Sequence, residues 1–480
     1  MKVNALIQKY KNLSLPLKVS VWFFVCSLLQ KGLAFLTTPL FTRLLSVDDY
    51  GIVSIFYSWE QIVVIFVTLG LANSVFNVGL VHNPDDRDNF QSSMLGLSLV
   101  SALFFSFLLW AFFPLISPSV QLENKYIAIL PILCFFATVL QMWSLRERFE
   151  YHYKAMALIT LLHTFLGTFI AILLVLDFED RAWGKIFGAS CVTIVIGLFC
   201  GLDFIRKSKK LFISKYWKFA LKYNIPMIPH FLSGVLLNQL DRIMIQRMCG
   251  LAQAGIYTVA YNSAMVVYIL NQSLSASYNP WLLQRLKTKN YGNIKKNVNI
   301  ILLCYSAALS IVILFAPEIM KIMAPIEYQA GIYVIPPVAA SMYFILLFNI
   351  YAPVEHYSLK TKFIAMASVF ATISKIILNI YFIDFWGYLA AGYTTLACYI
   401  LYAFAHYLYM KRVCRKNLDN INLFDNKFIW ILGGAITVFS VVLAFVYEYM
   451  LIRYVLILSI ALVLVMKKRS IQKTFKEMKK

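Results

Sequence analysis

Two adjacent charged residues, Asp241 and Arg242, lie inside the apolar segment LLNQLDRIMIQRMCG, residues 236–250. Each unpaired charge near the centre of a membrane helix costs about 2.5–3.5 kcal/mol, so such residues usually contact one another, water or a ligand. Successive residues point about 100° apart on a helix, so this pair does not share a face and each side chain needs its own partner. Chemically, the carboxylate can hold a proton or a cation, and the guanidinium can bind phosphate.

Three more charged residues lie within apolar segments: Lys31, Glu60 and Lys375. Together with Asp241 and Arg242 they form a set with one excess positive charge. Residues of this kind usually face an aqueous cavity, and a mildly cationic cavity suits an anionic cargo. We therefore predict substrate-binding roles for Lys31, Arg242 and Lys375, and coupling or ion-pair roles for Glu60 and Asp241. The alternative for each residue is a purely structural ion pair.

Prolines are expected to interrupt two helices, the one that carries Asp241 and Arg242 and the one centred near residue 342, and such breaks can act as hinges. The predicted breaks are at Pro226 and Pro229 in NIPMIPH, and at Pro336 and Pro337 in YVIPPVAA.

No catalytic residue, metal site or organic cofactor is predicted. The eight cysteines are scattered singly, and neither a phosphate-binding glycine loop nor a metalloprotease motif occurs. His163 and His230 are interpreted as packed core imidazoles. The only cofactor-like species expected is a coupling ion, H⁺ or Na⁺, on Glu60 or Asp241.

The elements that must position these residues are membrane helices. The 480 residues are 61% hydrophobic and 14% charged, far from the composition of a soluble domain. Apolar runs of about 20 residues recur along the chain, and each is long enough to cross the hydrocarbon core as a helix. The prediction is an all-α polytopic membrane protein with about fourteen transmembrane helices, centred near residues 30, 63, 102, 138, 166, 194, 235, 265, 306, 342, 373, 398, 436 and 458.

The net charge of +22 is explained by topology rather than by nucleic acid. Most of the 44 lysines and arginines fall in the even-numbered loops and the two tails. The positive-inside rule then places both termini in the cytoplasm. The loop HNPDDRDN, residues 82–89, fits this assignment poorly because it is net acidic. Membrane lipids are expected partners, and nucleic acid is not.

An internal repeat relates residues 39–58 to residues 243–262 at a constant offset of 204 residues. The offset covers six spans, which predicts two parallel six-helix bundles around a central cleft; chance alignment of apolar segments is the alternative. The identical positions are Arg43 and Arg247, Gly51 and Gly255, Ile52 and Ile256, and Tyr57 and Tyr261. The predicted domains are an N-terminal bundle (1–205), a basic cytoplasmic linker (206–222), a C-terminal bundle (223–415), and an extra helix pair with a basic tail (416–480).

Three segments carry a family resemblance: LLQKGLAFLTTPLFTRLLSVDDYGIVSIFYSW, NIPMIPHFLSG and LLNQLDRIMIQRMCGLAQAGIYTVAYNSA. With them, the chain resembles Wzx-type polysaccharide flippases, the exporters of O-antigen and capsule repeat units, in the MOP superfamily with MATE exporters and lipid II flippases. The resemblance implies an inner-membrane protein that flips an undecaprenyl-pyrophosphate-linked oligosaccharide to the periplasmic leaflet by alternating access. It also implies that Lys31, Arg242 and Lys375 face the pyrophosphate, that Asp241, Gly255 and Tyr257 match family positions, and that polymerase and chain-length proteins are partners.

Two other functions compete with this one. A drug or lipid exporter of the MATE type is the first, although the cationic set of buried residues is less suited to the cationic drugs such exporters usually carry. A membrane-embedded O-antigen polymerase or ligase is the second, although the predicted outer loops are short for a catalytic loop. The transporter prediction is therefore that of a non-enzyme.

Overall fold

The computed structural model describes residues 15–114, 120–357, 362–418 and 420–477. The described residues are mostly helical and contain no β-strand. This confirms the all-α fold expected from the composition. The chain divides into two compact units, Met1–Gln239 and Leu240–Lys480.

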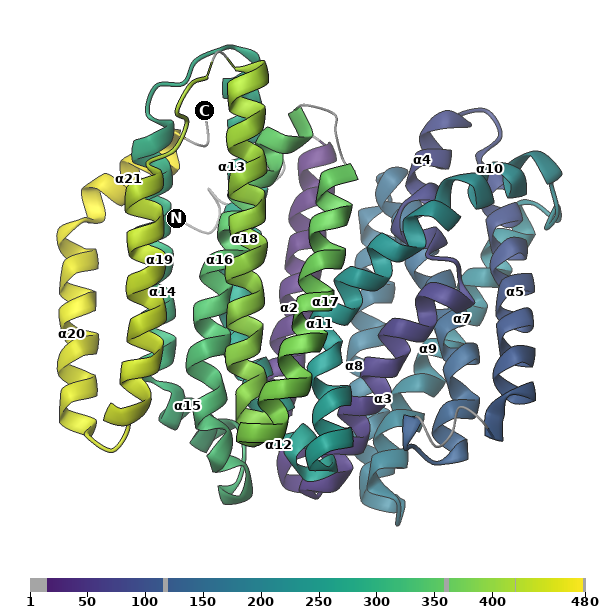
Figure 1. Ribbon diagram of the computed structural model, residues 1–480. Helices are drawn as coiled ribbons and strands as arrows, with labels where there is room; N and C mark the ends of the chain where they lie inside the picture. Colours follow the sequence, from purple (N-terminus) through teal and green to yellow (C-terminus); the bar gives the residue numbers. More distant parts are fainter. Residues whose placement is uncertain (1–14, 115–119, 358–361, 419, 478–480) are drawn as a thin grey trace, which may run out of the picture. The chain divides into compact units, whose positions relative to one another are not determined.

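The N-terminal unit contains the helices coloured from purple to teal in Figure 1. They are α2 (Leu15–Leu44), α3 (Val47–Val67), α4 (Val75–His82), α5 (Arg87–Ala111), α7 (Asn124–Phe149), α8 (Tyr153–Asp177), α9 (Arg181–Lys207), α10 (Ser214–Asn224) and the first part of α11 (Ile228–Cys249), with the short 3₁₀ helices η1 (Leu71–Asn73) and η2 (Ile225–Met227).

The C-terminal unit begins within α11 and continues to the yellow helices of Figure 1. Its further α-helices are α12 (Leu251–Ala264), α13 (Tyr268–Lys287), α14 (Ile294–Leu314), α15 (Ala316–Met323), α16 (Ile335–Tyr357), α17 (Lys362–Trp386), α18 (Ala390–Asn417), α19 (Asn426–Val442), α20 (Met450–Met466) and α21 (Lys468–Glu477). Its 3₁₀ helices are η3 (Met265–Val267), η4 (Ile326–Val334), η5 (Gly387–Leu389) and η6 (Leu443–Val446).

Every predicted span centre lies in a helix; the one near residue 265 falls in η3, between α12 and α13. By length and hydropathy, 10 helical stretches of the described chain could cross a membrane, or 11 if the bent pair α20 and α21 is included. One of the ten, Met366–Asn417, contains most of α17 and all of α18. The segments α11 and α12–α13 are not among them because they carry more polar residues, including Asp241 and Arg242.

The two repeated segments have the same local structure, with a tight turn joining α2 to α3 and another joining α11 to α12. In the first turn, Ser46 caps α3 by accepting the backbone N–H of Asp49 at 3.1 Å, and the Asp49 carboxylate accepts the backbone N–H of Ser46 at 3.2 Å. In the second, the equivalent residue is Gly250, whose φ of 110° is a conformation that favours glycine. The two copies differ at this position because the first turn uses a serine side-chain cap and the second uses a glycine with positive φ.

The four prolines lie where the helix type changes. Pro226 is in η2, between α10 and α11, and Pro229 is the second residue of α11. Pro336 and Pro337 follow η4 as the second and third residues of α16, inside the candidate span Ile326–Glu355. Proline is tolerated in a first turn because its missing N–H would have no intrahelical partner. Each proline pair accompanies a change from 3₁₀ helix to α-helix, and the breaks and their action as hinges stay predictions.

Residues of the predicted linker, 206–222, pack on the N-terminal unit, so the unit boundary falls later, within α11. The backbone N–H of Ile213 donates to Ser93 Oγ at 3.2 Å, and the Trp217 indole donates to the Ser93 carbonyl at 3.0 Å. A Cβ added to Gly96 in α5 would lie only 2.0 Å from the carbonyl oxygen of Leu211. The C-terminal pair α19 and α20 belongs to the same compact unit as α12–α18.

The acidic loop at residues 82–89 contacts this basic linker. The hydroxyl of Tyr216 donates to the Asp86 carboxylate, and Ser208 donates to Asn89 Oδ1 at 2.6 Å. The hydrogen bond from Tyr216, helped by nearby Lys210 and Lys215, holds the pKa of Asp86 below its usual value despite partial desolvation. The acidity of this loop therefore matches the charge of the segment beside it.

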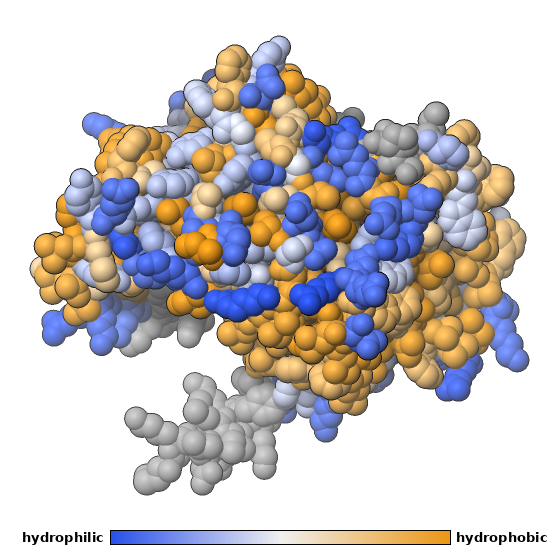
Figure 2. All heavy atoms as spheres, turned by 90° about the horizontal axis from the view of Figure 1, so that it is seen from below, coloured by the Kyte–Doolittle hydropathy of each residue, from blue (hydrophilic) through white to orange (hydrophobic). Residues whose placement is uncertain are grey.

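Large apolar side chains lie on the outside of the helices. On α5, Phe104, Phe107 and Trp110 are 56%, 67% and 57% exposed. Figure 2 shows hydrophilic side chains gathered across the face seen from below, with hydrophobic side chains beside and around them. Exposed apolar flanks with polar residues at the helix ends are expected of a bundle surrounded by lipid.

Candidate functional site

Asp241 is the centre of a fully buried cluster in the C-terminal unit. Its Oδ2 atom lies 2.7 Å from Nζ of Lys375 and accepts the hydroxyls of Tyr257 and Thr395 at 2.8 and 2.9 Å. Its Oδ1 atom accepts the side-chain amide of Asn379 at 2.8 Å. Asp241 and Lys375 are both 0% exposed. Both carboxylate oxygens are therefore hydrogen-bonded inside the protein.

Local helix geometry assembles this cluster from four helices. Lys375 and Asn379 are four residues apart in α17, so they lie on one face and reach the same carboxylate. Thr394 in α18 donates to the Asn379 side-chain oxygen, which turns the amide NH₂ toward Asp241. Breaking a buried ion pair by removing one partner costs about 3–5 kcal/mol. In this conformation the cluster therefore joins α11, α12, α17 and α18.

Arg242 has a different environment from its neighbour. Its guanidinium carbon lies 4.6 Å from the centroid of the Tyr261 ring, and the residue is 6% exposed. A cation over an aromatic face is stabilised by the ring quadrupole. The expectation that Asp241 and Arg242 need separate contacts is confirmed. Tyr261 is the residue that the internal repeat aligns with Tyr57.

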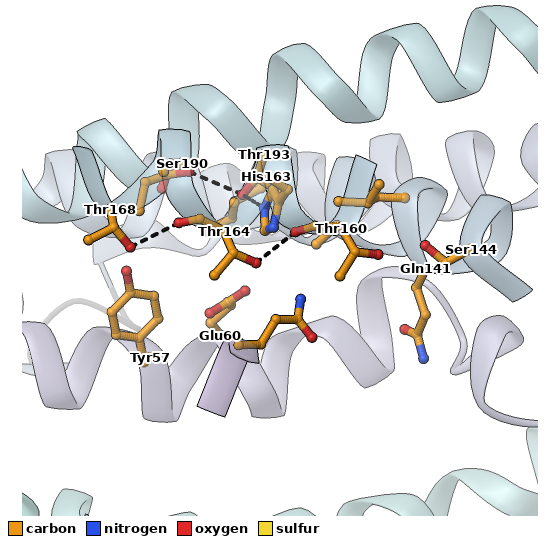
Figure 3. A pocket seen from close by; sticks show the side chains of 16 residues that line it. Tyr57, Glu60, Gln141, Ser144, Thr160, His163, Thr164, Thr168, Ser190 and Thr193 are labelled. Atoms are coloured by element: carbon orange, nitrogen blue, oxygen red, sulfur yellow. Dashed lines mark hydrogen bonds between the residues drawn. The ribbon is translucent and has the colours of Figure 1, made fainter. Parts of the chain in front are cut away.

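A polar cavity of about 500 Å³ lies within the N-terminal unit, among α2, α3, α7, α8 and α9 (Figure 3). Figure 3 shows Tyr57 and Glu60 projecting from α3 toward the threonines of α8. Tyr57 and Glu60 are three residues apart and therefore lie on one face of the helix. The polar side chains of the lining include Gln30, Tyr57, Glu60, Gln141, His163 and Thr193.

The wall of the cavity opposite Glu60 consists of hydroxyl groups and an imidazole. A ring nitrogen of His163 lies 2.9 Å from Thr193 Oγ. The hydroxyls of Thr164 and Thr168 donate to carbonyls one turn earlier at 2.7 and 2.9 Å, which leaves their oxygen lone pairs as acceptors. His163 thus lines a cavity, and its interpretation as a packed core residue was wrong. A carboxylate facing such groups can hold a proton or a small cation.

The predicted charged residues are distributed over both units. Lys31 is an exposed residue of α2, and Glu60 lines the cavity just described. Asp241, Arg242 and Lys375 lie in the C-terminal unit, where Lys375 is neutralised by Asp241. That all five line one aqueous cleft stays a prediction.

Glu355 and His406 form a second buried acid–base pair, which sequence reasoning missed. A ring nitrogen of His406 lies 2.9 Å from both carboxylate oxygens of Glu355, and both residues are 0% exposed. Glu355 lies in the last turn of α16, and a charged residue at a helix end is normally expected to be exposed. His406 lies among aromatic residues of α18. In the sequence, the pair is visible only as a glutamate and a histidine near apolar segments, and nothing there indicates that they meet.

Comparison with known proteins decides the family. A family model described as "Polysaccharide biosynthesis protein" matches residues 17–286, which is more than half of the 480 residues. The chain belongs to this family. None of the curated proteins compared with this family member is significantly similar in sequence.

Solved structures of membrane transporters share the fold of this family member. An inward-facing multidrug resistance MATE family transporter of the MOP superfamily is 12% identical, with a TM-score of 0.67 over 81% of this chain and 96% of that one. The lipid II flippase MurJ, in an inward closed conformation, is 16% identical, with a TM-score of 0.65 over 94% of this chain and 100% of that one. A point mutant of the Vibrio cholerae MATE transporter VcmN is 10% identical, with a TM-score of 0.53 over 85% and 97%. The family member therefore has the same fold as these three structures.

Proposed function

We propose that this protein is a flippase of the Wzx type, which moves an undecaprenyl-pyrophosphate-linked oligosaccharide from the cytoplasmic to the periplasmic leaflet of the bacterial inner membrane. The observation that carries the proposal is the polysaccharide-biosynthesis match over residues 17–286 in a chain with a transporter fold. Both termini face the cytoplasm in this proposal, and polysaccharide polymerase and chain-length proteins act on the product.

The polar cavity of the N-terminal unit supports ion coupling at Glu60. Its carboxylate shares the cavity with Tyr57, His163 and threonine hydroxyls, and membrane helices surround it. A proton taken up by Glu60 would remove a charge from this cavity, and Na⁺ would instead be held by the carboxylate and hydroxyl oxygens. Either ion would stabilise one conformation relative to the other and so couple its gradient to transport.

Pyrophosphate recognition is assigned to Arg242, with Lys31 and Lys375 as further contacts. Arg242 has a planar guanidinium that can bind two phosphate oxygens, and its ring contact with Tyr261 holds that plane in position. Lys375 can serve only in a conformation in which its pair with Asp241 opens. Its contribution would therefore belong to a different step of the cycle from that of Arg242.

Deleting the gene in its host tests the proposed function. The expected result is loss of surface polysaccharide together with complete lipid-linked repeat units that accumulate on the cytoplasmic leaflet, reversed by the wild-type gene. Normal polysaccharide with changed drug sensitivity would contradict the proposal and identify a drug exporter. Single repeat units that reach the surface without chain growth would contradict it as well and identify a polymerase.

A further inference from the structure

A second polar cavity, of about 860 Å³, lies at the end of the N-terminal unit where α7 ends and α5 and α8 begin. Its polar lining consists of Asn77, Arg87, Arg148, Glu150, Tyr151 and His152. None of these residues lines the cavity that contains Glu60. The transport proposal therefore leaves this cavity without a role.

Two arginines from different helices offer unused hydrogen-bond donors to this cavity. Arg87 donates its Nε to the Leu80 carbonyl at 3.2 Å, and its guanidinium carbon lies 5.0 Å from the centroid of the Phe149 ring. The guanidinium of Arg148 lies 4.3 Å from the centroid of the Phe23 ring. Among the residues that the structure describes, neither the Nη groups of Arg87 nor any guanidinium nitrogen of Arg148 has a hydrogen-bond acceptor. The aromatic rings hold both guanidinium groups while their N–H donors stay available.

The acidic groups near the cavity already lie beside basic side chains. Glu150 lies 4.0 Å from Lys207 Nζ and 3.6 Å from His152 Nδ1, and Glu147 accepts two hydrogen bonds from Arg146 at 2.5 and 2.9 Å. A metal ion on Glu147, Glu150 and His152, whose ligand atoms lie within 4.8 Å of one another, would compete with these partners. The remaining charge that faces the cavity is positive, so an anion is the favoured occupant.

We propose that this cavity binds the phosphate group of an anionic membrane lipid. Arginine pairs bind phosphate through several charge-assisted hydrogen bonds, and basic pockets between membrane helices bind lipid headgroups. The site borders apolar surface, since Phe23 and Tyr151 are 42% and 44% exposed. In the predicted orientation it lies at the cytoplasmic leaflet, on the side of the basic linker.

The outer face of α8 provides a path for the lipid chains. Leu158, Leu162, Phe165 and Phe169 are 59%, 41%, 52% and 58% exposed and recur at the spacing of one helix face. Leu158 follows the first residue of α8 by five positions, or about 7.5 Å along the helix axis. A phosphate in the cavity can therefore leave its acyl chains against this apolar stripe, which favours a lipid phosphate over a free one.

Binding to purified full-chain protein tests the proposal without any transport step, so its failure is separate from failure of the proposed function. Phosphatidylglycerol, inorganic pyrophosphate and zwitterionic phosphatidylcholine are titrated in detergent, and bound species are counted by native mass spectrometry. The test variant combines Arg87→Gln with Arg148→Gln. The matched control combines Arg412→Gln with Arg415→Gln, which removes two charges from exposed positions of α18.

The expected result is that phosphatidylglycerol binds wild type and control equally, and binds the test variant at least about tenfold more weakly. Phosphatidylcholine should bind all three proteins weakly and alike. Equal phosphatidylglycerol binding by the test variant and the wild type would overturn the proposal. Binding of pyrophosphate in preference to phosphatidylglycerol, lost in the test variant, would overturn the lipid assignment and identify a free phosphate site. If the glutamine variant does not fold, the Arg87→Lys, Arg148→Lys variant is tested instead. Its affinity for phosphatidylglycerol should be intermediate, and an affinity equal to that of the wild type would overturn the proposal.

Discussion

The buried pair of Lys375 with Asp241 permits a quantitative test. Lys375→Met would leave the Asp241 carboxylate at 0% exposure without its cation. Loss of one partner of a buried pair costs about 3–5 kcal/mol. Three neutral donors, from Tyr257, Asn379 and Thr395, would still contact the carboxylate at 2.8–2.9 Å. They offset part of the loss, so we expect a destabilisation of about 3 kcal/mol.

A second substitution separates loss of the ion pair from loss of packing. Asp241→Asn in the Lys375→Met background removes the unpaired charge, while the asparagine amide can still exchange hydrogen bonds with the rotatable hydroxyls of Tyr257 and Thr395. The double variant should therefore recover about 2 kcal/mol relative to Lys375→Met. A control, Lys411→Met at an exposed position of α18, should change stability by less than about 0.5 kcal/mol.

Equilibrium unfolding of the purified variants in mixed micelles measures these differences, with size-exclusion chromatography as the check of folding. Equal stability of Lys375→Met and the double variant would refute the reasoning, because it would show that the unpaired carboxylate carries no penalty. The stable double variant also separates two roles. Normal export by the double variant would show that the pair has a structural role. Loss of export by this stable variant would assign the pair to the transport cycle.

Three further predictions concern coupling, the substrate and the linker. Glu60→Gln should leave the fold intact and abolish the dependence of export on the proton or Na⁺ gradient in vesicles; unchanged gradient dependence would remove Glu60 from coupling. Arg242→Ala should reduce surface polysaccharide at normal protein level, with Arg242→Lys retaining part of it, and full export by the alanine variant would contradict pyrophosphate binding there. Gly96→Ala should destabilise the protein by about 1–3 kcal/mol because the new methyl would meet the Leu211 carbonyl, whereas Gly167→Ala, with no atom within 4 Å, should not; equal unfolding curves would argue against the packed linker.

The helices were predictable because apolar runs of membrane length are a strong local signal. All predicted centres fall in helices, and the prolines of NIPMIPH and YVIPPVAA mark real changes of helix type. The packing of the linker was less predictable. The linker's lysines indicated an exposed segment, but its Ile213 and Trp217 pack against α5, and such contacts depend on tertiary structure rather than on local composition.

The sequence indicates which buried charges need partners but not which side chains they contact. A charge in an apolar segment indicates that Asp241 needs a partner, yet only helix packing selects Lys375 among the available cations. The same limit explains why His163 was placed in a core and why Glu355 with His406 was missed. Which face of a membrane helix meets a cavity is set by its neighbours, and hydropathy alone does not encode it.

The most direct test of the flippase assignment is transport of the lipid-linked oligosaccharide by purified protein in vesicles. Undecaprenyl-pyrophosphate-linked repeat units are incorporated into both leaflets, and the fraction accessible to an added glycosidase outside the vesicles is followed with time under an imposed ion gradient. The account predicts that this fraction rises above one half with wild-type protein and stays near one half with Arg242→Ala or with empty vesicles. An unchanged fraction with correctly folded wild-type protein would contradict it.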